Sequence, residues 1–109
     1  MDLLMIDKPY INPHYQGFFA GRDEGIVSSG GKAARKPVAV LDVITLQVVM
    51  TAWSLDNGHY LVRGLDPNRE YLLIARDTQR GYEPYCYDWI QPSTTLSGDE
   101  QAALWQSWL

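Results

Sequence analysis

The stretch that decides the fold covers residues 37–77 and reads PVAVLDVITLQVVMTAWSLDNGHYLVRGLDPNREYLLIARD. It contains four runs rich in β-branched and aromatic residues, and turn-forming residues separate them. These runs predict strands at residues 36–43, 46–53, 59–63 and 70–77. The link between the first two strands is too short for a crossover helix, so we expect them to form an antiparallel hairpin.

Two turns and one long apolar run refine this prediction. Asn-Gly pairs favour the positive φ that a tight hairpin turn requires, so Asn57-Gly58 predicts a hairpin there. Pro67 fixes the φ of the first position of a second turn at residues 65–69. The nearly continuous apolar run at residues 70–77 is typical of a central strand that is covered on both faces.

Two shorter strands are predicted outside this stretch, at residues 26–28 and 82–90. Pro84 cannot donate a hydrogen bond to a ladder, so it indicates an edge strand or a bulge near the start of the last strand. Six short strands at roughly 8–12-residue intervals predict an all-β fold. The expected architecture is an antiparallel β-sandwich over residues 23–92.

Residues 1–22 are predicted to form an extended N-terminal arm, because they contain two prolines, two glycines and no sustained periodicity. The arm is aromatic, and we expect it to lie against a neighbouring subunit or protein. The alternative is that it covers its own sandwich. The candidate contact residues in the arm are Tyr10, Tyr15, Phe18 and Phe19.

Residues 93–109 are predicted to form a helical tail, with the helix at about residues 98–108. Ser97 and Glu100 have the spacing of a capping box. A helix of this length is marginal by itself, since isolated helices below roughly 12–15 residues are unstable in water. We predict that Trp105, Trp108 and Leu109 dock on a partner; the alternative is that the helix folds back and enlarges the core.

The composition sets limits on the function. The chain has 109 residues, a formal charge of −4 and one cysteine, Cys86. It is long enough for a single core, and its acidic balance argues against nucleic-acid binding. No apolar run is long enough to span a membrane, and the N-terminus lacks the basic region of a signal peptide. We therefore expect synthesis in the cytoplasm and no membrane partner.

Catalytic motifs are not found in the sequence. His14 and His59 have no metal-ligand spacing around them, and Cys86 has no basic neighbour in its strand. Lys32 follows a glycine pair, but Ala33 stands where a phosphate loop requires Ser or Thr. The prediction is a protein without catalytic residues, cofactor or metal, and therefore not an enzyme.

Several segments resemble the carboxypeptidase-regulatory-like, transthyretin-like β-sandwich family. They are Val-x-Val-x-Asp at residues 38–42, Gly-x-Tyr-x-Val at residues 58–62, and Tyr-x-x-x-Ala-x-Asp at residues 71–77. The resemblance covers about residues 25–92 and implies about seven antiparallel strands. Small stand-alone members with aromatic arms look like virion proteins of tailed phages or prophages.

The resemblance implies a structural or adaptor protein in a virion, assembled as a homo- or hetero-oligomer with other virion or tail proteins. One branch of the family hydrolyses 5-hydroxyisourate and ends in Tyr-Arg-Gly-Ser, whereas this chain ends in Gln-Ser-Trp-Leu. The alternatives are a ligand- or carbohydrate-binding module that uses Trp and Tyr as stacking platforms, and a small hydrolase. No nucleophile–base pair supports the hydrolase.

Overall fold

The computed structural model describes residues 14–22, 27–29, 31–76 and 85–109. The elements in chain order are β1 (Gly17–Gly21), β2 (Ser28–Ser29), β3 (Lys32–Ala33), β4 (Pro37–Asp42), β5 (Val48–Trp53), β6 (Tyr60–Leu65), β7 (Tyr71–Ala75), β8 (Tyr85–Ile90) and α1 (Gly98–Trp108). Tyr10 and Pro84, both named above, lie outside the described residues.

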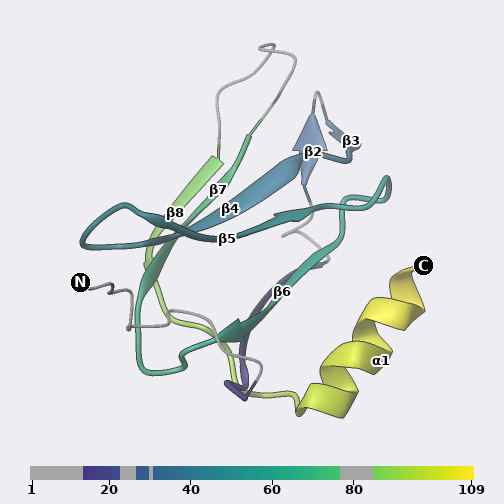
Figure 1. Ribbon diagram of the computed structural model, residues 1–109. Coiled ribbons are helices and arrows are strands. Elements are labelled where there is room, and N and C mark those ends of the chain that lie inside the picture. Colours follow the sequence, from purple (N-terminus) through teal and green to yellow (C-terminus); the bar gives the residue numbers. More distant parts are fainter. Residues whose placement is uncertain (1–13, 23–26, 30, 77–84) are drawn as a thin grey trace.

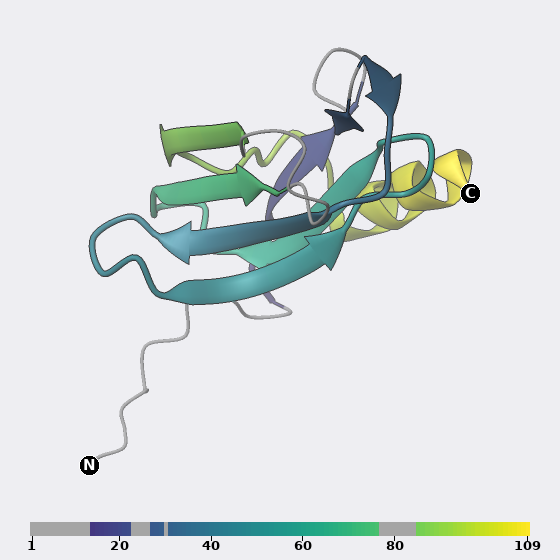
Figure 2. The same cartoon turned by 90° about the horizontal axis from the view of Figure 1, so that it is seen from above.

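Two antiparallel sheets form the body of the molecule (Figure 1). One sheet has the strand order β5-β4-β7-β8, and the other pairs β1 with β6. Strands β2 and β3 form a small separate hairpin. The helix α1 lies beside β6 (Figures 1 and 2). The prediction of an all-β, antiparallel, sandwich-like fold with a short C-terminal helix is therefore confirmed.

The core fills the space between the two sheets. Tyr60 and Val62 of β6 are buried, as their alternation predicts, and Leu73 of β7 is 1% exposed. The ring of Tyr60 lies on the backbone of Gly21, where a β-carbon would collide with it. The buried apolar residues that form the core are Val27, Val38, Val40, Tyr60, Val62, Leu65, Tyr71 and Leu73.

The predicted hairpin between β4 and β5 is confirmed, and Asp42 shapes its turn. The Oδ1 atom of Asp42 accepts hydrogen bonds from the backbone N–H groups of Ile44 (2.8 Å) and Thr45 (2.9 Å). Burial opposes ionisation of this carboxyl, but the hydrogen bonds from Thr45 and Ile44, together with the charge of Arg69, hold the pKa of Asp42 below its usual value. Leu46 completes the turn with a φ of 61°.

The turn at Asn57-Gly58 forms, but it does not join two strands of one sheet. Gly58 has a φ of 83°, as predicted, and its N–H donates to the carbonyl of Leu55. The strands on either side, β5 and β6, belong to different sheets. The hairpin prediction is wrong because local turn chemistry fixes the reversal of the chain and not the sheet that receives the next strand.

The N-terminal arm is wrongly predicted in its second half. Residues 17–21 form β1, which pairs antiparallel with β6. Phe18 also exchanges two backbone hydrogen bonds with Ser93, at 3.0 and 2.9 Å. This segment therefore belongs to the sandwich and is held on both of its edges.

The position of β7 is confirmed, but its predicted coverage is wrong. It lies between β4 and β8, and its inward-facing Leu73 is buried. Leu72 and Ile74 point to the opposite face and are only half-buried. The reason is that α1 lies against the two-stranded sheet, so no described element covers the outer face of the four-stranded sheet (Figure 2).

Candidate protein-interaction surface

The edge strand β8 exposes three aromatic side chains. Tyr85 is 59% exposed, Tyr87 48% and Trp89 55%. Within the described part of the chain, β8 pairs with β7 on one side only, so its other edge carries no strand. We call Tyr85, Tyr87 and Trp89 on this strand the aromatic edge.

A bulge interrupts β8 near its end. Tyr71 pairs with Ile90 and Leu73 pairs with Tyr87, so β8 has one residue more than β7 in this interval. Trp89 lies in the bulge with a φ of 53°, a left-handed conformation that costs a bulky residue energy. The bulge leaves the preceding residues 85–87 as a regular strand edge with exposed side chains.

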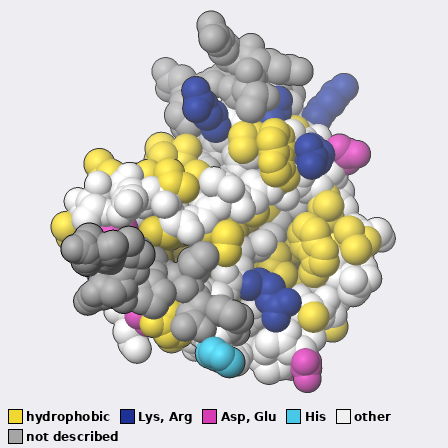
Figure 3. Space-filling model, viewed as in Figure 1, with side chains coloured by type: hydrophobic (Ala, Val, Ile, Leu, Met, Phe, Trp, Pro, Cys, Tyr) yellow, Lys and Arg dark blue, Asp and Glu magenta, His cyan; other side chains and the backbone are white. Residues whose placement is uncertain are grey.

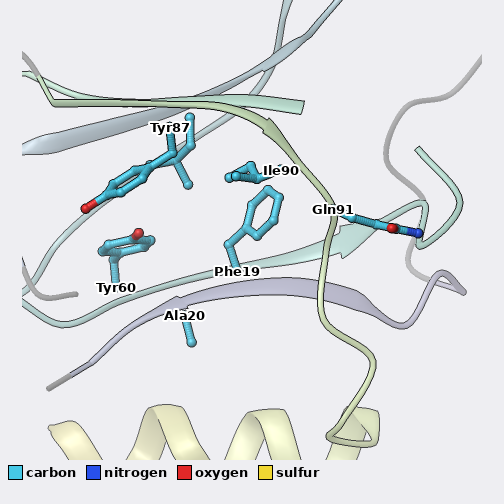
Figure 4. Close-up of a pocket in the computed structure, with 7 residues that line it drawn as sticks. Phe19, Ala20, Tyr60, Tyr87, Ile90 and Gln91 are labelled. Carbon is cyan, nitrogen blue, oxygen red and sulfur yellow. The ribbon is translucent and has the colours of Figure 1, made fainter. Parts of the chain in front are cut away.

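A cavity of about 350 Å³ opens between β8 and the second sheet. Phe19, Leu73 and Ile90 form its apolar wall, and Tyr60 and Tyr87 face each other from opposite sheets (Figure 4). The side chain of Gln91 points away from the cavity, because its Nε2 donates to the carbonyl of Pro67 at 2.7 Å. The volume lies at the lower end of the range for small-molecule sites, roughly 300–1,000 Å³.

The hydroxyl of Tyr60 is the polar group of this cavity. Tyr60 is only 7% exposed as a residue, and it lines the cavity. Burial, together with the nearby Tyr87 hydroxyl, raises the pKa of Tyr60 to about 12. The group is therefore a neutral phenol near pH 7, able to donate one hydrogen bond and accept another.

Arg63 and Gln101 fasten the first turn of α1 to the second sheet. The guanidinium of Arg63 donates to the Gln101 Oε1 atom (3.1 Å) and to the carbonyl of Gly98 (2.9 Å). The Nε2 group of Gln101 donates to the carbonyls of Gln16 and Leu96. Gln101 is 2% exposed with its amide fully bonded, so a polar contact anchors this end of the helix.

The capping box predicted at the start of α1 is confirmed. Ser97 Oγ accepts from the backbone N–H of Glu100, and the Glu100 carboxylate accepts from the N–H of Ser97. At the other end, Asn57 Nδ2 donates to the carbonyl of Trp108 at 3.0 Å. The ring of His59 lies 4.7 Å from that of Trp108.

The helix therefore folds back on its own domain, which was the alternative to the docking prediction. Trp105 and Trp108 meet edge to face with ring centroids 6.1 Å apart, and both are half-buried. Leu109 is 69% exposed. Of the three predicted docking residues, Trp105 and Trp108 are therefore partly buried, whereas Leu109 remains exposed.

We expect the double substitution Trp105→Ala and Trp108→Ala to lower the free energy of unfolding by about 2–4 kcal/mol, because both rings lose packing. Urea unfolding followed by circular dichroism measures this loss. Leu109→Ala is the control, since its side chain is largely exposed, and its expected effect is within about 0.5 kcal/mol. An unchanged midpoint in the double variant, with loss of association, would instead support docking on a partner.

The structure distributes the predicted contact residues unevenly. Phe18 is 2% exposed, so its side chain is buried within the domain and is not available to a partner. Phe19 meets Tyr71 edge to face and lines the cavity. Tyr15 is half-buried, and Tyr10 lies outside the described residues. Among the predicted contact residues that the structure describes, only Phe19 lines the cavity beside the aromatic edge.

The aromatic edge itself was missed by the sequence analysis, which treated residues 82–90 only as a strand. The available signal was the alternation of Tyr85, Tyr87 and Trp89 in a strand that Pro84 already marked as an edge. Alternating aromatic residues on an edge strand are expected to face either the core or a partner. The structure shows that these three are exposed.

Other chemistry on the described surface is sparse. No cluster of three metal-ligating side chains occurs among the described residues, and Cys86 is exposed. No helix in the described ranges is long and apolar enough to cross a membrane. Figure 3 shows hydrophobic side chains in separate patches, with Lys and Arg side chains between and above them. Comparison of the chain with protein-family models, curated proteins and solved structures found no match.

Proposed function

We propose that this protein is a non-enzymatic structural or adaptor protein that binds a neighbouring protein through the aromatic edge. The observation that carries the proposal is the exposure of Tyr85, Tyr87 and Trp89 on a strand whose outer edge is unpaired in the described structure. The sequence resemblance adds the setting. We place the protein in the virion of a tailed phage or prophage, with other virion or tail proteins as partners in a homo- or hetero-oligomer.

The physical argument rests on strand pairing and on aromatic burial. An unpaired strand edge offers a row of N–H and C=O groups to another chain. Tyr and Trp are enriched among the residues that dominate binding energy, because they bury a large area at a small entropic cost. A partner that covers these three half-exposed aromatic side chains removes their apolar surface from water, and this burial stabilises the assembly.

We expect the double substitution Tyr85→Ser and Trp89→Asn to weaken association at least about tenfold, because it removes two aromatic contacts and keeps the backbone edge. Asparagine suits position 89, since it tolerates the left-handed conformation found there. Size-exclusion chromatography with light scattering, on the protein alone and co-expressed with the products of adjacent reading frames, measures association.

Trp53→Asn is the matched control. Trp53 is 49% exposed and lies on β5, the opposite edge strand of the same sheet. The guanidinium carbon of Arg35 lies over its ring, 4.6 Å from the ring centroid. Equal association of the wild type and the double variant would refute the proposal. An equal loss in the Trp53→Asn control would show that any exposed aromatic residue has the same effect, and it would also refute a specific role for β8.

The second candidate function is carbohydrate binding, and the pair Tyr85 and Tyr87 favours it. Residues two apart in a strand share one face, so these two rings form a platform on which sugars stack. Titration with a glycan panel, followed by tryptophan fluorescence, separates the two functions. A glycan that quenches the wild type and not the Tyr85→Ser variant would favour carbohydrate binding.

A further inference from the structure

The cavity borders a second open strand edge, which belongs to β1. Phe18 uses its N–H and C=O to bind Ser93 on the side of β1 that faces away from β6. Alternate residues of a strand direct their backbone groups to the same edge, so Ala20 directs its own to this edge as well. Within the described residues, Ser93 is the only backbone partner along it.

The chain leaves this edge directly next to Ser93. Pro92 cannot donate a hydrogen bond, Gln91 is held by the carbonyl of Pro67, and Ile90 pairs with Tyr71 in the other sheet. The chain therefore diverges from β1 at this point, and we call the space between β1 and β8 the fork. The cavity of about 350 Å³ lies in this fork.

Ala20 contributes its backbone to the cavity. Its methyl group points toward α1, on the far side of the sheet from the cavity (Figure 4). Ala20 nevertheless lines the cavity, so the lining atoms belong to its peptide groups. An extended segment that continues the line of Ser93 would meet these groups. Its residues on either side of the Ala20 partner would point toward the same face as Phe19, into the cavity.

We propose that the fork between β1 and β8 binds an extended peptide segment of the partner protein, which pairs with Ala20 and inserts one aromatic side chain carrying a polar atom into the cavity. This inference rests on the proposed function, because it states how the partner is held. Phe19, Leu73 and Ile90 surround the ring of the inserted side chain. The hydroxyl of Tyr60, a residue that is 7% exposed, binds its polar atom.

We favour strand addition over binding of a free small molecule, because a segment of the chain itself already adds to this edge. Residues that precede Pro92 and follow it lie against two different sheets, and the segment at Ser93 already adds to β1 through a pair of backbone hydrogen bonds. The next positions on that edge offer the same geometry. Main-chain bonds supply affinity in this mode of recognition, and the pocket supplies specificity.

Amide hydrogen exchange of the full-length protein, measured by NMR, tests the open edge without any ligand. We expect the Ala20 amide to exchange much faster than those of Phe18, Phe19 and Gly21, which bond to Ser93 or lie on the edge that faces β6. Protection of Ala20 equal to that of Phe18 would overturn the proposal, because the edge would already be occupied.

The binding step is tested with end-blocked pentapeptides of sequence Thr-Val-X-Val-Thr, in which X is Tyr, Trp, Leu or Ala. Peptides with X as Tyr or Trp are expected to shift the amide signals of Ala20 and Ile90, and to bind at least about tenfold tighter than the Ala peptide. Equal binding of all four peptides overturns the proposal. So does binding of 4-methylphenol or 3-methylindole when the peptides do not bind, since the cavity is then a small-molecule site.

Two variants locate the contact. Ala20→Pro removes the outward N–H and leaves the ladder to β6 intact, and Tyr60→Phe removes only the hydroxyl. Both are expected to weaken the Tyr peptide by about tenfold or more, whereas Trp53→Asn has no effect. If Ala20→Pro does not fold, Tyr60→Phe and the exchange data decide. Association that is lost in the Tyr85→Ser, Trp89→Asn variant and intact in these variants would refute the fork and leave the proposed function standing.

Discussion

Removal of residues 1–22 is expected to unfold the domain. The deletion takes away β1, and with it the buried side chain of Phe18, the edge-to-face contact between Phe19 and Tyr71, and the only described partner strand of β6. Truncation of one buried phenylalanine costs about 3–5 kcal/mol. The loss of Phe18, of the half-buried Phe19 and of the ladder together is comparable to the whole stability of a small domain, about 5–15 kcal/mol.

The matched control for this truncation removes residues 1–13 and keeps β1. Circular dichroism and thermal melting of the two shortened chains and the full chain give the comparison. We expect a cooperative transition for the chain that retains Gly17–Gly21 and none for the chain that begins at residue 23. A cooperative melt of residues 23–109 near the full-length midpoint would mean that the arm is a separate appendage, as the sequence alone suggested.

Tyr71→Ala is expected to be the most destabilising single substitution, by about 4–6 kcal/mol, because it combines a large cavity with a lost hydrogen bond. Tyr71 is fully buried, its ring meets Phe19 at 6.0 Å, and its hydroxyl accepts from the backbone N–H of Asp66 at 3.0 Å. The hydroxyl thus ties β7 back to the turn that precedes it, in the manner of a tyrosine corner. Urea unfolding measures the change in stability.

Tyr71→Phe separates the two contributions, because it keeps the ring and removes the hydroxyl. We expect it to cost about 1–2 kcal/mol, the loss of a bond to a part-buried N–H group. If the phenylalanine and alanine variants lose the same stability, the hydroxyl rather than the ring dominates at this position. An alanine variant as stable as the wild type would contradict the packing of the core between the sheets.

The strands that the sequence predicted well are those in which local preference and burial agree. The β-branched residues of β4 and β5 favour an extended chain, and their short link leaves pairing as the only solution. The start of α1 was equally accessible, because Ser97 and Glu100 satisfy each other within one turn. In both cases the deciding contacts lie close together in the sequence.

Strand β1 was missed because its glycines serve packing rather than turning. A β-carbon at Gly17 would collide with the carbonyl oxygen of Leu65, and one at Gly21 would collide with the ring of Tyr60. Both neighbours are far away in the sequence, so nothing near these glycines distinguishes them from turn residues. The cavity escaped prediction for the same reason, since residues from β1, β6, β7 and β8 line it.

The contact between the two ends of the chain has a consequence for synthesis. Phe18 exchanges hydrogen bonds with Ser93, and Gln101 donates to the carbonyl of Gln16, a residue 85 positions earlier. A ribosome releases the N-terminal strand long before it releases the segments that complete it. Contacts of such long range close late and slow the folding of β-rich domains. The edge of β1 that binds Ser93 therefore stays open until the segment around Ser93 has been synthesised, whereas β6, the partner of β1 on its other edge, is made earlier.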